Sequence, residues 1–115
     1  ELLILCNDAD VTSLTQNLQR ELKNQHYMLV NVSDARALFE VSGSGIREVI
    51  AKLAPVNIAK LGIGEIRRTR FSQVAAAFWL TSETSLNVIC FSSVADYMFN
   101  LLKTSSMPNS KVGDF

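Results

Sequence analysis

The sequence is poor in the residues that build metal sites and nucleophilic active sites. Its 115 residues include one histidine and two cysteines, which is too few for a structural zinc site with four such ligands. Cys6 and Cys90 each lie in an apolar run, and we interpret both as reduced core residues rather than as a disulfide. His26 has no acid, base or nucleophile beside it in the sequence, which favours a surface or capping role over catalysis.

The sequence also lacks an excess of charge and a long hydrophobic run. Eleven basic residues balance eleven acidic ones, so no net field attracts nucleic acid or an anionic membrane surface. The longest apolar stretches, such as residues 74–80, are far shorter than the roughly 20 residues that span a bilayer. No charged segment followed by an apolar stretch and a cleavage site opens the chain. We therefore expect a soluble cytoplasmic protein that binds neither nucleic acid nor membrane.

The composition indicates one globular domain. Hydrophobic residues make up 48% of the chain and charged residues 19%, which is far from the composition of disordered proteins. A chain of this length supports a single hydrophobic core. Because the residues from Thr104 onward are polar and include Pro108 and Gly113, we predict one domain over residues 1–103 and a poorly ordered tail over residues 104–115.

Apolar residues at helical spacing predict three helices. The stretches are residues 11–24, 46–53 and 94–102. Asp10 and Ser44 are the predicted N-caps of the first two helices, and Ser93 forms a predicted capping box with Asp96 before the third. Pro55 is expected to stop the second helix.

Six runs have the apolar, β-branched or aromatic content of strands. They are residues 2–6, 27–32, 35–41, 65–71, 73–80 and 85–91. Ser33 and Asp34 supply turn chemistry that predicts a hairpin between the second and third runs. Short connections favour antiparallel pairing of the last three. We predict a single α+β domain with an antiparallel or mixed sheet of about six strands and three principal helices, in the order β-α-β-β-α-β-β-β-α.

The densest charge cluster lies on one of these predicted strands. Strand alternation places Arg68 and Arg70 on one face and Arg67 on the other. A phosphate clamp would use only part of this set, so a solvated edge or the acidic surface of a partner is the favoured interpretation. The turn at residues 42–45 also has no phosphate-binding signature, because the P-loop lysine and the dinucleotide spacing are missing. No catalytic, cofactor-binding or metal site is predicted.

Several predicted strands are apolar on both faces, including residues 2–6, 73–80 and 85–91. Such strands are normally covered on both sides, whereas three short helices can cover one face of a six-stranded sheet. An exposed apolar sheet surface marks an interface. We therefore predict that the face bearing Trp79 packs against another subunit, with Arg67, Arg68 or Arg70 making polar contacts at its rim.

The order and spacing of local patterns between Met28 and Leu102 resemble the gamma subunit of heterotetrameric sarcosine oxidase. The segments that carry the resemblance are VSDARA at 32–37, VSG at 41–43 with REVIAKLAP at 47–55, RTRF at 68–71, AFWL at 77–80 and SSVADYMFNLL at 92–102.

This resemblance implies a non-catalytic, structural subunit of a cytoplasmic complex that oxidises the N-methyl group of sarcosine. The products of that reaction are glycine, hydrogen peroxide and, with tetrahydrofolate as one-carbon acceptor, methylenetetrahydrofolate. In the family the FAD, FMN, NAD and zinc belong to the other subunits, and the large alpha subunit is the expected partner. The resemblance also implies a fold related to the folate-dependent aminomethyltransferases.

Two other functions remain open from the residues alone. A stand-alone folate-binding or aminomethyltransferase-like domain needs a carboxylate to hold the pterin ring, and the predicted strands offer chiefly Glu40 and Glu65. An RNA-binding sheet domain would display stacking aromatic residues on central strands with basic residues around them, and the zero net charge argues against it.

Overall fold

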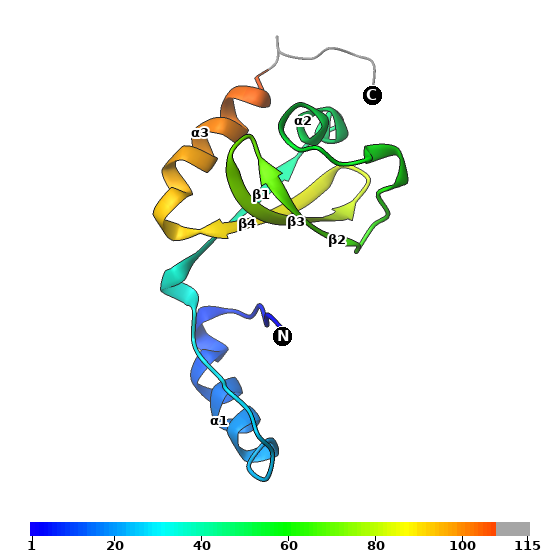
Figure 1. Ribbon diagram of the computed structural model, residues 1–115. Helices are drawn as coiled ribbons and strands as arrows, with labels where there is room; N and C mark the ends of the chain where they lie inside the picture. Colours follow the sequence, from blue (N-terminus) through cyan, green and yellow to red (C-terminus); the bar gives the residue numbers. More distant parts are fainter. Residues whose placement is uncertain (108–115) are drawn as a thin grey trace. The chain divides into compact units, whose positions relative to one another are not determined.

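The computed structural model describes residues 1–107, which divide into two compact units (Figure 1). The first unit is Glu1–Asn31 and the second begins at Val32. Most of the predicted tail, residues 108–115, lies outside the described residues, whereas Thr104 and Ser105 form the end of the last helix.

The first unit is built around one amphipathic helix. A 3-10 turn at Asp8–Asp10 leads into α1 (Val11–Glu21), which is three residues shorter than predicted. Asp10 precedes the helix as expected, but its side chain makes no capping hydrogen bond. No residue of α1 is buried. The helix therefore contributes no buried residue to a hydrophobic core.

The two predicted strands of the first 32 residues are absent. Residues 2–6 and 27–32 have no regular secondary structure, and Ser33–Ala35 forms a 3-10 turn instead of the predicted hairpin turn. The prediction of about six strands is therefore wrong. Both segments have strand-like side chains, but a strand also needs a neighbour for its backbone N–H and C=O groups. Within the described residues, neither segment is paired with another strand.

The second unit contains a four-stranded antiparallel sheet. Its strands are β1 (Arg36–Ser42), β2 (Ile66–Phe71), β3 (Val74–Ser82) and β4 (Ser85–Phe91), in the order β1-β4-β3-β2. The last three strands form the predicted antiparallel meander, and β1 joins it by pairing with β4. Residues 1–107 also contain three α-helices, so the chain is the α+β protein that the sequence predicts.

Two helices cover one face of this sheet, α2 (Ile46–Leu53) and α3 (Ala95–Ser105) (Figure 1). The strand register aligns Phe39, Val88 and Phe78 in one row across β1, β4 and β3 on that face. Burial of such side chains stabilises the fold by about 2 kcal/mol each. The fully buried core consists of Ile46, Ile50, Phe71, Phe78, Leu80, Leu86, Val88 and Met98.

The caps of these two helices differ from the predicted ones. Gly45, and not Ser44, precedes α2, and Val94 precedes α3, so neither helix has a side-chain cap. The predicted capping box of Ser93 is therefore absent. A 3-10 turn at Ser92–Val94 takes its place. In that turn the Ser92 hydroxyl donates a 2.8 Å hydrogen bond to the carbonyl of Asp34, which attaches the start of α3 to the segment before β1.

Candidate functional site

Three of the four predicted interface residues lie on the sheet face that points away from α2 and α3, which we call the distal face. Arg68 pairs with Ala77 across β2 and β3, and Trp79 pairs with Ile66. Phe78, next to Trp79 in β3, points into the core on the other face. Strand alternation puts Arg68 and Arg70 on one face, as the sequence predicts, and the register of β2 with β3 brings Trp79 to that same face.

The middle of the distal face is apolar. One cross-strand row runs from Leu38 through Ile89 and Ala77 to Arg68, and a neighbouring row ends at Trp79 and Ile66. Leu38 is 49% exposed and Ile66 is 59% exposed. Ile89 lies in a central strand between Leu38 and Ala77 and is only 8% exposed. Trp79 is half-buried. Neither α2 nor α3 covers these side chains.

Charged residues border this apolar surface at both edge strands. On β1 the Arg36 guanidinium lies 4.3 Å from the centre of the Phe91 ring, which is 53% exposed. On β2 the exposed Arg68 and Arg70 form no ion pair within residues 1–107. Glu40, on β1, is the carboxylate that alternation places on this face. The distal face therefore carries more positive than negative charge.

Arg67 does not belong to this surface. Its register partner is Phe78, so it points to the helix-covered side of β2. There its guanidinium donates a 2.9 Å hydrogen bond to the Glu65 carboxylate, which also accepts a bond from the backbone N–H of Gly62. Glu65 and Arg67 lie two positions apart at the start of an edge strand, and this spacing is the signal in the sequence that predicts their contact.

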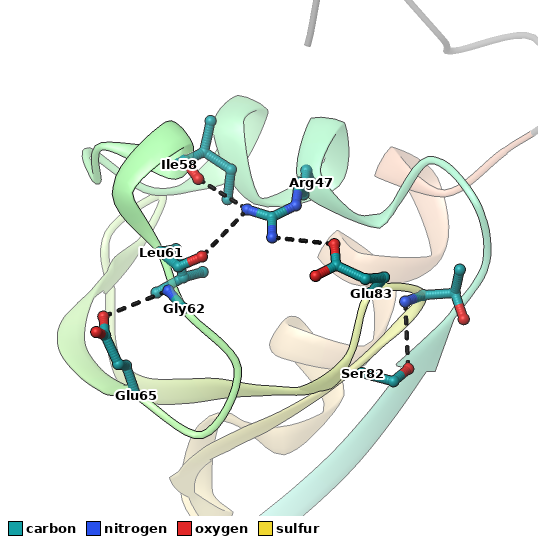
Figure 2. A network of polar contacts seen from close by, with 8 residues as sticks. Arg47, Ile58, Leu61, Gly62, Glu65, Ser82 and Glu83 are labelled. Carbon is teal, nitrogen blue, oxygen red and sulfur yellow. Dashed lines mark hydrogen bonds and ion pairs between the residues drawn. The ribbon is translucent and has the colours of Figure 1, made fainter.

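A polar cluster around Arg47 was not predicted from the sequence (Figure 2). From the first turn of α2, Arg47 donates to the carbonyl of Ile58 at 2.9 Å and to the carbonyl of Leu61 at 3.4 Å. It also pairs with Glu83 in the turn between β3 and β4 at 3.3 Å. The cluster connects three separate segments of the second unit. Its main acceptors are backbone carbonyls, which leave no signature in a sequence.

The two cysteines of the chain belong to different units. Both cysteines are free: Cys6 is exposed, contrary to the predicted core position, and Cys90 is buried in β4. Burial raises the pKa of the Cys90 thiol, which keeps it protonated and poorly nucleophilic. Within residues 1–107 no three His, Cys, Asp or Glu side chains gather at a possible metal site. In the same range, no helix combines the length and the apolar character needed to cross a membrane.

Two surface depressions have volumes of about 300 and 260 Å³, at the lower end of the range for ligand pockets. The first lies between the end of α2 and Arg70, and the second lies beside the turn at residues 42–45. Glu48 lines the second, but its buried carboxylate already pairs with Lys52 at 3.8 Å. Glu40 and Glu65, the candidates for holding a pterin ring, line neither depression.

Comparisons with known proteins identify a matching family model and a solved structure with a similar fold. A family model described as the sarcosine oxidase, gamma subunit family matches residues 1–108. A chain in the solved structure of the heterotetrameric sarcosine oxidase from Corynebacterium sp. U-96, in complex with pyrrole 2-carboxylate, is similar with a TM-score of 0.79 at 19% sequence identity. The match covers 86% of this chain and 52% of the other, so this chain spans about half the length of its structural neighbour. No curated protein matches.

Proposed function

Because the chain belongs to the sarcosine oxidase gamma subunit family, we propose that it is a non-catalytic subunit of a heteromeric sarcosine oxidase. The observation that carries this proposal is the family match over residues 1–108. The shared fold with one chain of a heterotetrameric sarcosine oxidase supports it. A helix-covered core on one side of the sheet and an apolar distal face on the other are also consistent with a subunit that functions by binding a neighbour.

We propose that the complex oxidises sarcosine to glycine in the cytoplasm and passes the one-carbon unit to tetrahydrofolate. The FAD, FMN, NAD and zinc of such a complex are assigned to the partner subunits, of which the large alpha subunit is the proposed neighbour. The arrangement of this chain supports that division of labour. Its two cysteines lie in different units, and the Arg47 guanidinium is bound to the backbone carbonyls of Ile58 and Leu61.

The test is co-expression of this chain with the other sarcosine oxidase subunits of the same organism. The chain should elute with them as one species in size-exclusion chromatography, and omitting it should lower the yield of assembled, sarcosine-oxidising complex. An assembled complex with full activity and no trace of this chain would contradict the proposal. A rise in the melting temperature of the isolated chain with tetrahydrofolate would instead favour the folate-binding alternative.

A further inference from the structure

We propose that the distal face docks a partner-protein surface with an apolar centre and carboxylates on the side that meets β2. The inference rests on the proposed function, because it names the surface through which this subunit joins its complex. It is drawn from three observations on the described residues: the exposed apolar side chains, the unpaired arginines at one edge, and the imbalance of charge on this face.

All four strands contribute apolar side chains to the distal face. Leu38 on β1, Phe91 on β4 and Ile66 on β2 are each about half exposed, and Trp79 on β3 is half-buried between Asn87 and Ile66 in its row. Scattered apolar residues are normal on protein surfaces, but a contiguous apolar patch on a sheet marks an interaction site. The aromatic rings supply the large rigid contacts that are typical of interface centres.

The arginines determine the chemistry of the partner. Arg68 and Arg70 project from the edge strand on the same face and meet no carboxylate within residues 1–107. A guanidinium binds a carboxylate through two parallel hydrogen bonds. In contrast, Arg36 at the opposite edge is already stacked on Phe91. Complementary carboxylates are therefore expected on the side of the partner that faces β2.

A second copy of this chain does not offer that complement. The face carries three arginines, Arg36, Arg68 and Arg70, against one carboxylate, Glu40. Two such faces packed together would leave several arginines without acidic partners in a partly desolvated interface, which is unfavourable. The balance of eleven basic and eleven acidic residues in the chain argues against nucleic acid as the occupant. A different protein subunit fits this chemistry.

The single tryptophan of the chain makes a direct test possible. The full chain, labelled with 5-fluorotryptophan, has one fluorine resonance, which reports on the distal face at Trp79. A soluble gadolinium chelate should broaden this resonance in the isolated chain. Assembly with the unlabelled partner subunits should reduce the broadening at least about threefold, because interface centres exclude solvent.

Two pairs of variants test the chemistry. The double substitution Arg68→Glu and Arg70→Glu should weaken assembly more than about tenfold, whereas Lys60→Glu, at an exposed position in the 3-10 turn Ile58–Lys60 before β2, should not. Leu38→Ser should also weaken assembly, whereas Tyr97→Ser on α3, which is 50% exposed, should leave it unchanged. Circular dichroism of each variant verifies that the fold is retained.

The possible failures are distinguishable. Equal broadening in the free chain and in the assembled complex would overturn the docking surface while leaving the proposed function intact. Protection of Trp79 in the isolated monomer would overturn the docking surface, because the chain's own residues would then cover it. Protection that appears only as the chain dimerises would overturn it in favour of a second copy. A wild-type chain that fails to assemble would contradict the inference and the proposed function together.

Discussion

The backbone N–H of Ser72, in the two-residue turn between β2 and β3, donates a 2.8 Å hydrogen bond to the carbonyl of Leu53 at the end of α2. The last carbonyls of a helix have no partner within the helix, so the hairpin turn satisfies one of them. Ser72 has a positive φ of 57°, a conformation that glycine adopts more easily than other residues. The turn therefore connects the sheet to the helix through one backbone group.

Replacing Ser72 with proline should destabilise the chain by at least about 3 kcal/mol, because proline has no N–H and its φ is fixed near −65°. Ser72→Gly is the matched control, and it should keep or slightly raise stability by up to about 1 kcal/mol. Urea denaturation followed by circular dichroism measures both. A proline variant as stable as the wild type would show that this bond does not support the fold.

Arg47→Ala should lower the free energy of unfolding by about 1–3 kcal/mol, because it leaves the carbonyls of Ile58 and Leu61 without their donor. Glu83→Gln removes only the ion pair. The Glu83 side chain is 71% exposed, so that change should cost less than about 1 kcal/mol. Equal losses in the two variants would mean that the exposed ion pair, and not the carbonyl contacts, provides the stabilisation.

Phe78 and Trp79 are neighbours on opposite faces of β3, and alanine substitutions should separate their roles. Phe78→Ala removes a fully buried ring that packs against Phe71 and should cost about 3–5 kcal/mol. Trp79→Ala should cost about half of that or less in the isolated chain, since Trp79 is only half-buried in it. Chemical denaturation of both variants provides the comparison. The reverse order would contradict the assignment of faces.

The two cysteines should differ in reactivity toward a thiol reagent such as dithionitrobenzoate. Cys6 is exposed and should react quickly, while Cys90 should react only after the chain unfolds. In a Cys6→Ser variant the fast reaction should disappear. Two rapidly reacting thiols in the folded wild type would contradict the burial of Cys90.

The same burial predicts a dependence of stability on pH. Because the pKa of Cys90 is raised in the folded chain, the unfolded chain ionises this thiol first. Its contribution to stability is complete below the ordinary thiol pKa, about 8.5, and falls as the pH rises beyond that value. Between pH 7 and 9.5 the wild type should lose more unfolding free energy than Cys90→Ser, which has no such thiol.

The parts of the fold that the sequence predicts well are determined by local patterns. The second helix begins at Ile46 and ends before Pro55, as the apolar spacing and the proline indicate. The meander of β2, β3 and β4 follows from short polar turns between apolar runs. By contrast, residues 2–6 and 27–32 were predicted as strands from composition, and composition does not reveal whether another strand is available to pair with them.

In the candidate site, too, local patterns are predictable from the sequence and long-range contacts are not. Alternation along one strand is enough to place Arg68 and Arg70 together and Arg67 apart from them. The position of Trp79 relative to these arginines depends on the register of a neighbouring strand, which the short turn at Ser72 sets. Arg47 contacts backbone oxygens 11 and 14 positions away and the Glu83 carboxylate 36 positions away, and no spacing rule anticipates such bonds.

The sheet order also has a consequence for folding. Two-residue turns join β2, β3 and β4, so these strands can pair through local contacts. In contrast, β1 must pair with β4 across an intervening segment of roughly 40 residues. Closing a loop of that length costs about 3 kcal/mol of chain entropy, so β1 is expected to join the sheet after the meander has formed. During synthesis, β1 leaves the ribosome before β4 has been made. Until β4 emerges, the apolar side chains of β1 have no sheet to join, and in this interval the new chain is most exposed to aggregation.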